Sequence, residues 1–320
     1  MAVYTEVDPE TASRVLQAWD AGQLRSLQGA ASGIENTNYF VETSTGAWVL
    51  TVFERLDFDQ LPFYLGLMQH LARHGLPVPE PRTDAAGGFL QRIVGKPASL
   101  VTMLPGACVD APDVHHCELL GEVLARMHLA AADFPLQQAN LRGIDWWTAT
   151  VPVVTPYLPP DLAARVNDEL AFQQRFAAAA ATHALPQAAV HADLFRDNAL
   201  FDGPDDAPRL SGIFDFYFAG TDHLAYDLAV VLNDWCIDLA SGKLQEARAE
   251  ALVAAYRAVR PLGAAELRAL PALRRGAALR FWLSRLADWH LPRAASVLSA
   301  KDPVHFERVL ADCIERPWHA

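Results

Sequence analysis

The feature that most constrains the fold is an abrupt change of hydrophobic pattern near residue 105 of the 320-residue chain. Before this point, β-branched and aromatic residues gather in short runs that are typical of strands. After it, alanine- and leucine-rich segments repeat with the spacing of a helix, and only residues 188–218 return to a strand-like pattern. The sequence therefore predicts an α+β fold with a small sheet lobe over residues 1–104 and a larger, mainly helical lobe over residues 105–320.

Two hairpins and one helix are expected in the small lobe. Segment 39–54 predicts an antiparallel pair that turns at residues 44–46, and segment 88–104 predicts a second pair that turns at residues 95–97. Between them, apolar residues recur on one helical face over Leu61–Arg73. In the large lobe, helices are expected at about residues 118–128, 160–182, 225–240, 244–259 and 264–290.

Charge and composition exclude several classes of partner. The formal net charge is −12, from 26 basic and 38 acidic residues, and this opposes broad affinity for nucleic acid or an anionic membrane. No window approaches 18 uninterrupted apolar residues and the N-terminus has no positive leader, so we expect a cytoplasmic protein without a membrane span. The four cysteines form no Cys-x-x-Cys pair, which favours reduced structural thiols over a zinc site or a disulfide framework.

The strand-like island carries a compound polar motif. His191, Asp193 and Asn198 form a His-x-Asp-x4-Asn pattern, and Asp215 follows Asn198 by seventeen residues, directly after two apolar residues. Carboxylate and amide oxygens are the ligands and proton acceptors of magnesium–phosphate chemistry, and a hairpin between the two parts would return Asp215 beside the start of the motif. The alternative is a polar loop whose Asp and Asn residues cap turns. The compound pattern favours a catalytic function, because an apolar hairpin gives little reason to place an acid at Asp215.

With these motifs the sequence resembles the superfamily of small-molecule kinases that includes the aminoglycoside phosphotransferases and choline kinases. The resemblance spans nearly the whole chain and implies a bilobal protein-kinase-like fold, with a nucleotide-binding lobe at 1–104 and a catalytic and acceptor-binding lobe at 105–320. Six segments closely resemble the homoserine kinases of this superfamily: Gly33–Tyr39, Leu61–Met68, Asp215–Phe218, Ala225–Ala229, Asn233–Cys236 and Leu279–Arg285. The implied reaction moves the γ-phosphoryl group of ATP to the hydroxyl of L-homoserine, with magnesium, to give O-phospho-L-homoserine for threonine biosynthesis.

The resemblance also implies roles for the motif residues. Asp193 would accept or orient the proton of the attacking hydroxyl, and Asn198 and Asp215 would hold magnesium against the ATP phosphates. His191 is interpreted as a structural residue that ties the catalytic loop in place. Asp227, at the start of an apolar helical stretch, is interpreted as a structural anchor.

A loop ahead of the first hairpin lies where such kinases cover the ATP phosphates. Its candidate contacts are Gly33, Asn36, Thr37 and Asn38. The loop is not glycine-rich, so an ordinary polar turn is the alternative.

The phosphate-binding lysine and glutamate of ordinary kinases are both absent. Thr51 stands at the strand position of the lysine, and Phe63 and Tyr64 stand where the helix glutamate would fall. The joint loss indicates a differently built phosphate site that includes Thr51. Arg55 and Arg92 would either compensate for the missing lysine or be surface charges.

The segment between the lobes is the expected hinge for adenine. Thr102, Met103 and Leu104 would offer backbone groups to the base in an apolar cleft. A buried edge strand running into a linker is a compatible description of the same residues.

The acceptor site is expected in the helical lobe. Homoserine carries a carboxylate, an ammonium group and a hydroxyl, so its pocket needs a guanidinium fork, an acid and a base. The candidates are Asn233 and Asp234 on one helix and Arg280, Ser284 and Arg285 on another, where Arg280 and Ser284 share a face. Amphipathic packing with arginines at the surface is the alternative.

Two rival functions stay open from the sequence. A kinase of choline, ethanolamine or an aminoglycoside would need acidic or aromatic acceptor surfaces in place of Arg280 and Arg285. A catalytically silent nucleotide-binding regulator is suggested by the missing lysine and glutamate, but the intact Asp193, Asn198 and Asp215 argue against it. The sequence gives no sign of an oligomeric state.

Overall fold

A computed structural model describes residues 4–30, 36–204, 206–291 and 301–320. It divides into two compact units, Met1–Gly106 with Ser211–Phe214, and Ala107–Leu210 with Asp215–Ala320. The first division lies two residues beyond the predicted end at residue 104, and the inclusion of Ser211–Phe214 in the first unit was not predicted. None of the helices within the described ranges is both long enough and apolar enough to span a membrane.

The first unit contains a five-stranded antiparallel sheet in the order β1-β2-β3-β5-β4. Its strands are β1 Leu24–Gly29, β2 Thr37–Thr43, β3 Ala47–Val52, β4 Gln91–Ile93 and β5 Lys96–Thr102. Both predicted hairpins are confirmed. The second turns one residue earlier than expected, through Val94 and Gly95, whose φ angles are both positive (48° and 81°), so that β5 already begins at Lys96.

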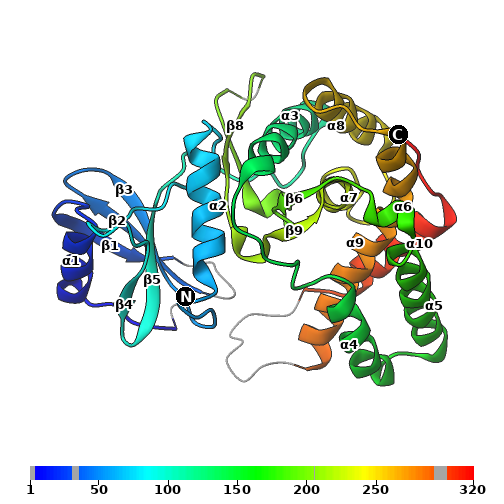
Figure 1. Cartoon of the computed structure of the whole chain (residues 1–320), viewed down its shortest axis with the longest axis horizontal. Coiled ribbons are helices and arrows are strands. Elements are labelled where there is room, and N and C mark those ends of the chain that lie inside the picture. Colours follow the sequence, from blue (N-terminus) through cyan, green and yellow to red (C-terminus); the bar gives the residue numbers. More distant parts are fainter. Residues whose placement is uncertain (1–3, 31–35, 205, 292–300) are drawn as a thin grey trace. The chain divides into compact units, whose positions relative to one another are not determined.

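Two helices, α1 (Pro9–Ala18) and α2 (Leu61–Arg73), cover opposite faces of this sheet (Figure 1). The predicted bounds of α2 are confirmed, whereas α1 and β1 were not predicted. The apolar face of α1 shares one core cluster with Leu50 and Leu100 of the sheet. Because successive strand residues point to opposite faces, the paired residues Thr51 and Ser99 belong to the other face.

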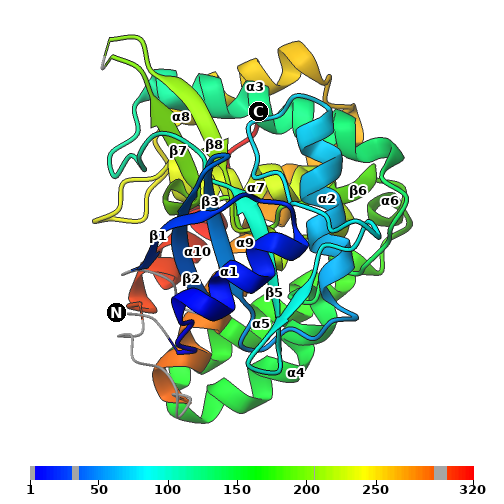
Figure 2. The ribbon, with the colours of Figure 1, turned by 90° about the vertical axis from the view of Figure 1, so that its left-hand side faces the viewer.

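The second unit is mainly helical, and α3 packs along α8 (Figure 2). Its helices are α3 Val114–Ala130, α4 Ile144–Val154, α5 Pro160–Ala177, α6 Ala180–His183, α7 Leu224–Trp235, α8 Glu246–Val259, α9 Ala264–His290 and α10 Val304–Glu315. All five predicted helical segments are confirmed, although 160–182 is split into α5 and α6 and α7 ends at Trp235. Every residue of α7 is buried, so this helix is the centre of the core of the unit.

Short strands hold the loops that carry the polar motif. β6 (Gln187–Val190) pairs with β9 (Gly220–His223), and β7 (Ala199–Asp202) pairs with β8 (Arg209–Ile213). The motif therefore occupies the connection between β6 and β7 and the segment between β8 and β9. β9 was not predicted, and neither were α4 and α10.

Candidate active site

Asp227 of α7 anchors the loop that follows β6. Its completely buried carboxylate accepts hydrogen bonds from the backbone N–H groups of His191 at 2.9 Å and Ala192 at 2.7 Å. The ring of His128, from α3, lies 3.1 Å from the same carboxylate through Nε2. Burial by itself would raise the pKa of Asp227, but the His128 bond, the nearby histidine charges and the loop N–H groups hold it below the ordinary value of 3.8. The predicted anchoring role of Asp227 is confirmed.

The backbone of the anchored loop is strained at Ala192. Its φ of +62° is unfavourable for a residue with a Cβ atom, and the bonds to Asp227 hold this conformation in place. His191 is buried, and its Nδ1 accepts from the N–H of Asp193 at 3.3 Å. Its ring lies 4.6 Å from that of Phe216, next to Asp215. The structural role predicted for His191 is therefore confirmed, and its ring joins the two parts of the motif.

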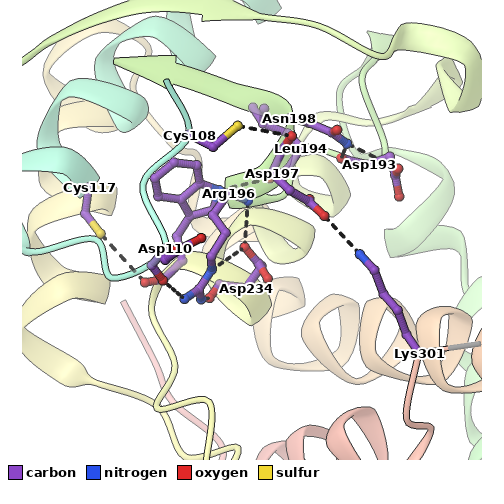
Figure 3. Close-up of polar contacts among 11 residues, drawn as sticks. Cys108, Asp110, Cys117, Asp193, Leu194, Arg196, Asp197, Asn198, Asp234 and Lys301 are labelled. Atoms are coloured by element: carbon purple, nitrogen blue, oxygen red, sulfur yellow. Dashed lines mark hydrogen bonds and ion pairs between the residues drawn. The ribbon is translucent and has the colours of Figure 1, made fainter. Parts of the chain in front are cut away.

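The Asp193 carboxylate is fixed between two partners. Its Oδ1 lies 3.2 Å from Nη1 of Arg280, a side chain that is itself only 2% exposed. On the other side, Asn198 donates from Nδ2 to the Asp193 backbone carbonyl at 2.8 Å and lies 3.4 Å from Oδ2 (Figure 3). Burial raises the pKa of Asp193, although Arg280 opposes the rise. Asp193 is thus a positioned and comparatively basic carboxylate.

Asn198 and Asp215 both carry side-chain oxygens that can bind a metal ion, and Asn198 lies beside the Asp193 carboxylate. The bonds of Asn198 through Nδ2 direct its amide nitrogen toward Asp193, which turns the amide oxygen to the opposite side. Asp215 has left-handed backbone angles (φ 63°, ψ 58°) and immediately precedes a short 3-10 helix. Non-glycine residues in this region are uncommon and gather at functional sites. An amide oxygen and a carboxylate are suited to a hard cation such as Mg²⁺.

Asp234 holds the far end of the loop. It accepts from the backbone N–H of Arg196 at 2.8 Å and from its Nε at 3.1 Å, while Arg196 Nη1 donates to the Asp110 carbonyl at 2.9 Å (Figure 3). Burial raises the pKa of Asp234 and the Arg196 charge opposes the rise. The sequence analysis did not predict a role for Arg196. The signal that could have indicated one is its position inside the motif, between Asp193 and Asn198.

A cavity of about 300 Å³ lies beside this ion pair. Its lining residues are Asp110, Phe195, Arg196, Asp197, Asp234, Leu239, Arg285, Lys301 and His305. Arg285 donates to the Asp302 carbonyl at 3.0 Å. Lys301 pairs with Asp197 at 2.9 Å (Figure 3). Burial lowers the pKa of His305 to about 4, so this residue adds no positive charge at neutral pH.

The predicted acceptor residues are only partly brought together. Arg280 contacts Asp193, whereas Asp234 and Arg285 line the cavity. Half-buried Ser284 lies on α9 between the two arginines. Asn233 does not join them. It is fully buried, donates to the Arg274 carbonyl at 2.7 Å and accepts from Arg274 Nε at 3.0 Å, so it packs α7 against α9 and is no longer a candidate for the acceptor.

The predicted phosphate contacts in the first unit separate onto two faces of the sheet. Thr51 Oγ1 donates to Asn38 Oδ1 at 2.8 Å across the β2–β3 pair. Thr37, the neighbour of Asn38, points to the opposite face, where it is buried and donates to Glu54 at 2.7 Å. Thr37 is therefore not placed with Asn38 and Thr51. Gly33 lies outside the described residues.

Two further residues of the first unit bear on the sequence predictions. Asn36 accepts from the Glu54 N–H at 3.4 Å. Arg92 lies over the Phe58 ring at 4.3 Å and donates to the Gly95 carbonyl at 2.7 Å, so it stabilises the β4–β5 turn.

The predicted hinge is the end of β5 and the residues that follow. Thr102 Oγ1 accepts from the Glu80 N–H at 2.8 Å, and the Met103 N–H donates to the Ala47 carbonyl at 3.2 Å. Met103 is 47% exposed, and Leu104 is half-buried. This segment thus combines an ordered backbone with accessible apolar side chains.

Comparison with known proteins places this chain in a family. Residues 26–262 match the phosphotransferase enzyme family. The chain is 54% identical over 318 residues to the homoserine kinase of Polaromonas naphthalenivorans, with 99% of each chain covered. It is 51% identical over 314 residues to the homoserine kinase of Cupriavidus pinatubonensis, covering 97% of this chain and 95% of that one.

Solved structures agree in fold. An amicoumacin kinase in complex with AMP-PNP and Ca²⁺ has a TM-score of 0.70 at 16% identity, over 97% of this chain and 94% of that one. A Plasmodium vivax ethanolamine kinase has a TM-score of 0.63 at 12% identity, over 98% and 91%. These likenesses confirm the predicted protein-kinase-like α+β fold. The chain belongs to the phosphotransferase enzyme family and, within it, to the group formed by the homoserine kinases.

Proposed function

We propose that this enzyme transfers the γ-phosphoryl group of ATP to the hydroxyl of L-homoserine, giving O-phospho-L-homoserine as a step of threonine biosynthesis. The observation that carries the proposal is the Asp193 carboxylate, held between Asn198 and the buried guanidinium of Arg280. Sequence identity of 54% and 51% to two homoserine kinases over nearly the full chain supports the same acceptor.

Asp193 is the proposed proton acceptor. Its raised pKa suits a group that orients the attacking hydroxyl and receives its proton as the oxygen–phosphorus bond forms. Asn198 and Asp215 are the proposed ligands of Mg²⁺. When bound, the cation would neutralise charge on the β- and γ-phosphates.

The nucleotide contacts are proposed to be largely uncharged. Asn36, Asn38 and Thr51 would offer amide and hydroxyl groups to the phosphates, and Gly33 remains a proposed contact from the sequence. The hydrogen bond between Thr51 and Asn38 keeps both side chains on one sheet face. The backbone at residues 102–104 would contact adenine.

Arg280, rather than Arg285, is the proposed partner of the acceptor carboxylate. Only Arg280 touches the proposed base, so it alone can hold one end of the acceptor while Asp193 receives the proton from the other. Ser284, one helical turn away on the same face, is the proposed additional polar contact.

Coupled ADP release tests this proposal with L-homoserine, L-serine, choline and kanamycin as acceptors. Homoserine should give the highest kcat/KM, and Asp193→Ala should lower kcat by about 100- to 10,000-fold, the usual scale for a positioned base. Asp202→Ala is the control, since its hairpin pair with Arg209 is at the surface. Preferred turnover of choline or kanamycin would refute the acceptor, and ATP binding without ADP release from any alcohol would instead favour the regulator.

A further inference from the structure

Two buried polar atoms near Asp193 have no hydrogen-bond partner within the described part of the chain. They are Nε of Arg280 on α9 and the hydroxyl oxygen of Tyr226 on α7, and these two helices pack against each other (Figure 1). We infer that Arg280 and Tyr226 together form the receptor for the carboxylate of the acceptor, which makes Tyr226 a specificity-determining residue. The inference rests on the proposed function and extends it to a residue to which the sequence analysis assigned no role.

Arg280 is buried more deeply than its ion pair with Asp193 explains. Its side chain is 2% exposed, and its guanidinium lies 4.0 Å from the Phe281 ring centroid and 5.3 Å from that of Phe218. Nη1 faces Asp193, but Nε–H faces no acceptor among the residues that the structure describes. A buried donor without a partner is costly, and Nε–H can only donate. An anionic oxygen of a ligand would satisfy it.

Tyr226 is in a comparable position. The residue is 3% exposed and directly precedes Asp227, whose carboxylate fixes the loop that carries Asp193. Burial raises the pKa of Tyr226, and the positive charge of Arg280 opposes that rise, so the two groups lie within each other's field. The hydroxyl therefore stays protonated at neutral pH and is available to donate.

The Nε–H of Arg280 and the hydroxyl of Tyr226 are two donors in a positively charged setting, and such a pair selects a carboxylate. An ammonium group would be repelled by Arg280, whereas a carboxylate has one oxygen for each donor. A second guanidinium, that of Arg142, lies 5.7 Å from the centroid of the same Phe218 ring and adds positive charge. Each of the three acids whose charge acts on Tyr226 has its own partners: Asp193 pairs with Arg280, and Asp227 with His128 and loop N–H groups. Asp222 accepts from Nδ2 of Asn140 at 2.8 Å and from the His223 N–H at 2.7 Å. Arg280 would then bridge the acceptor carboxylate and the base.

Steady-state kinetics of Tyr226→Phe, with homoserine and its decarboxylated analogue 3-aminopropanol as acceptors, test the inference. The homoserine KM should rise about 10- to 100-fold, as expected when a hydrogen bond to a charged group is lost. The constants for 3-aminopropanol and the KM for ATP should change by less than about three-fold. The melting temperature without ligands should not fall, because phenylalanine removes an unsatisfied hydroxyl.

Tyr39→Phe is the matched control. Tyr39 is also buried, but its hydroxyl accepts from the Val7 N–H at 3.0 Å and donates to the Thr5 carbonyl at 3.0 Å. This control should lose thermal stability and keep the homoserine KM, the reverse of the Tyr226 result. If the wild type phosphorylates homoserine and Tyr226→Phe leaves the homoserine KM unchanged, the inference about Tyr226 is wrong and the proposed function stands. A wild-type enzyme that does not phosphorylate homoserine would overturn the proposed function as well.

Discussion

Replacing Asp227 with asparagine should weaken the hydrogen bonds that hold the loop of Asp193 to α7. An asparagine keeps one carbonyl oxygen, but its NH₂ group then faces one of the two backbone donors, of His191 or Ala192. One hydrogen bond to a charged acceptor is lost, at about 1.5–3 kcal/mol, and one buried N–H is left without an acceptor, at about 1–3 kcal/mol. Asp227→Asn should therefore lower the free energy of unfolding by about 4 kcal/mol, a large part of the usual total.

The same change should reduce catalysis. Ala192, with its positive φ, directly precedes Asp193, so a relaxed loop moves the proposed base. A displacement of about 1 Å lowers kcat by roughly 100-fold. Urea unfolding followed by circular dichroism measures the first effect, and ADP release at saturating substrate measures the second.

Asp312→Asn is the control for general destabilisation. Asp312 is a buried carboxylate that accepts from the Leu244 N–H at 3.1 Å and pairs with Arg316, and neither partner belongs to the loop. This variant should lose stability but keep kcat. Surface substitutions usually change the free energy of unfolding by no more than about 0.5 kcal/mol. If the free energy of unfolding of Asp227→Asn lies within that range of the wild-type value and kcat is unchanged, the anchoring argument is wrong.

The stability difference should also depend on pH. The folded-state pKa of Asp227 is depressed below 3.8, so its contribution is complete above the unfolded pKa and is lost as pH falls through the folded value. The difference in unfolding free energy between wild type and Asp227→Asn should be constant above about pH 5 and shrink below about pH 4. A difference that grows toward low pH would contradict this assignment.

Four other substitutions give distinct outcomes. Gly121→Ala should lower unfolding free energy by about 2 kcal/mol or more in urea titrations, since its Cβ would lie 2.3 Å from the Leu252 carbonyl oxygen; unchanged stability would mean that α3 and α8 can move apart at little cost. Thr51→Ala should change kcat and the ATP KM by less than about ten-fold, because one neutral hydrogen bond is lost. A loss of activity as large as that caused by replacing the phosphate-binding lysine of an ordinary kinase would refute the uncharged phosphate site. Arg280→Leu should raise the homoserine KM and lower kcat. Arg285→Leu should shift neither constant by more than about three-fold, because of the two arginines only Arg280 touches the proposed base. Equal effects of the two substitutions would instead indicate that the carboxylate of the acceptor binds in the 300 Å³ cavity.

The catalytic motif could be predicted because its parts are close in sequence. Asp193 and Asn198 belong to one loop, and a hairpin returns the chain to Asp215. Period-2 and helical patterns likewise located the hairpins and most helices. The pleat of a strand also predicts that Thr37 and Asn38 face opposite sides, so their separation follows from the sequence once β2 is assigned.

Other features depend on tertiary packing that local pattern does not contain. The N-cap Asp8 signals α1, but only Ala12, Val15 and Leu16 of this helix are buried, which is a weak periodic signal. Asn233 lies on a helix buried on every side, so amphipathicity could not distinguish a site-facing residue from a packing residue. Tyr226 lies in a segment that resembles the homoserine kinases, but the sequence assigned it no role. The lack of a hydrogen-bond partner for its hydroxyl among the described residues is visible only in three dimensions.

The most direct test of the central claim identifies the product. Phosphorus NMR of the wild-type enzyme with ATP, Mg²⁺ and L-homoserine should show a new phosphomonoester signal that couples to the methylene protons next to the former hydroxyl. ATP consumed with only inorganic phosphate formed, or a phosphorus signal without that coupling, would contradict transfer to the homoserine hydroxyl.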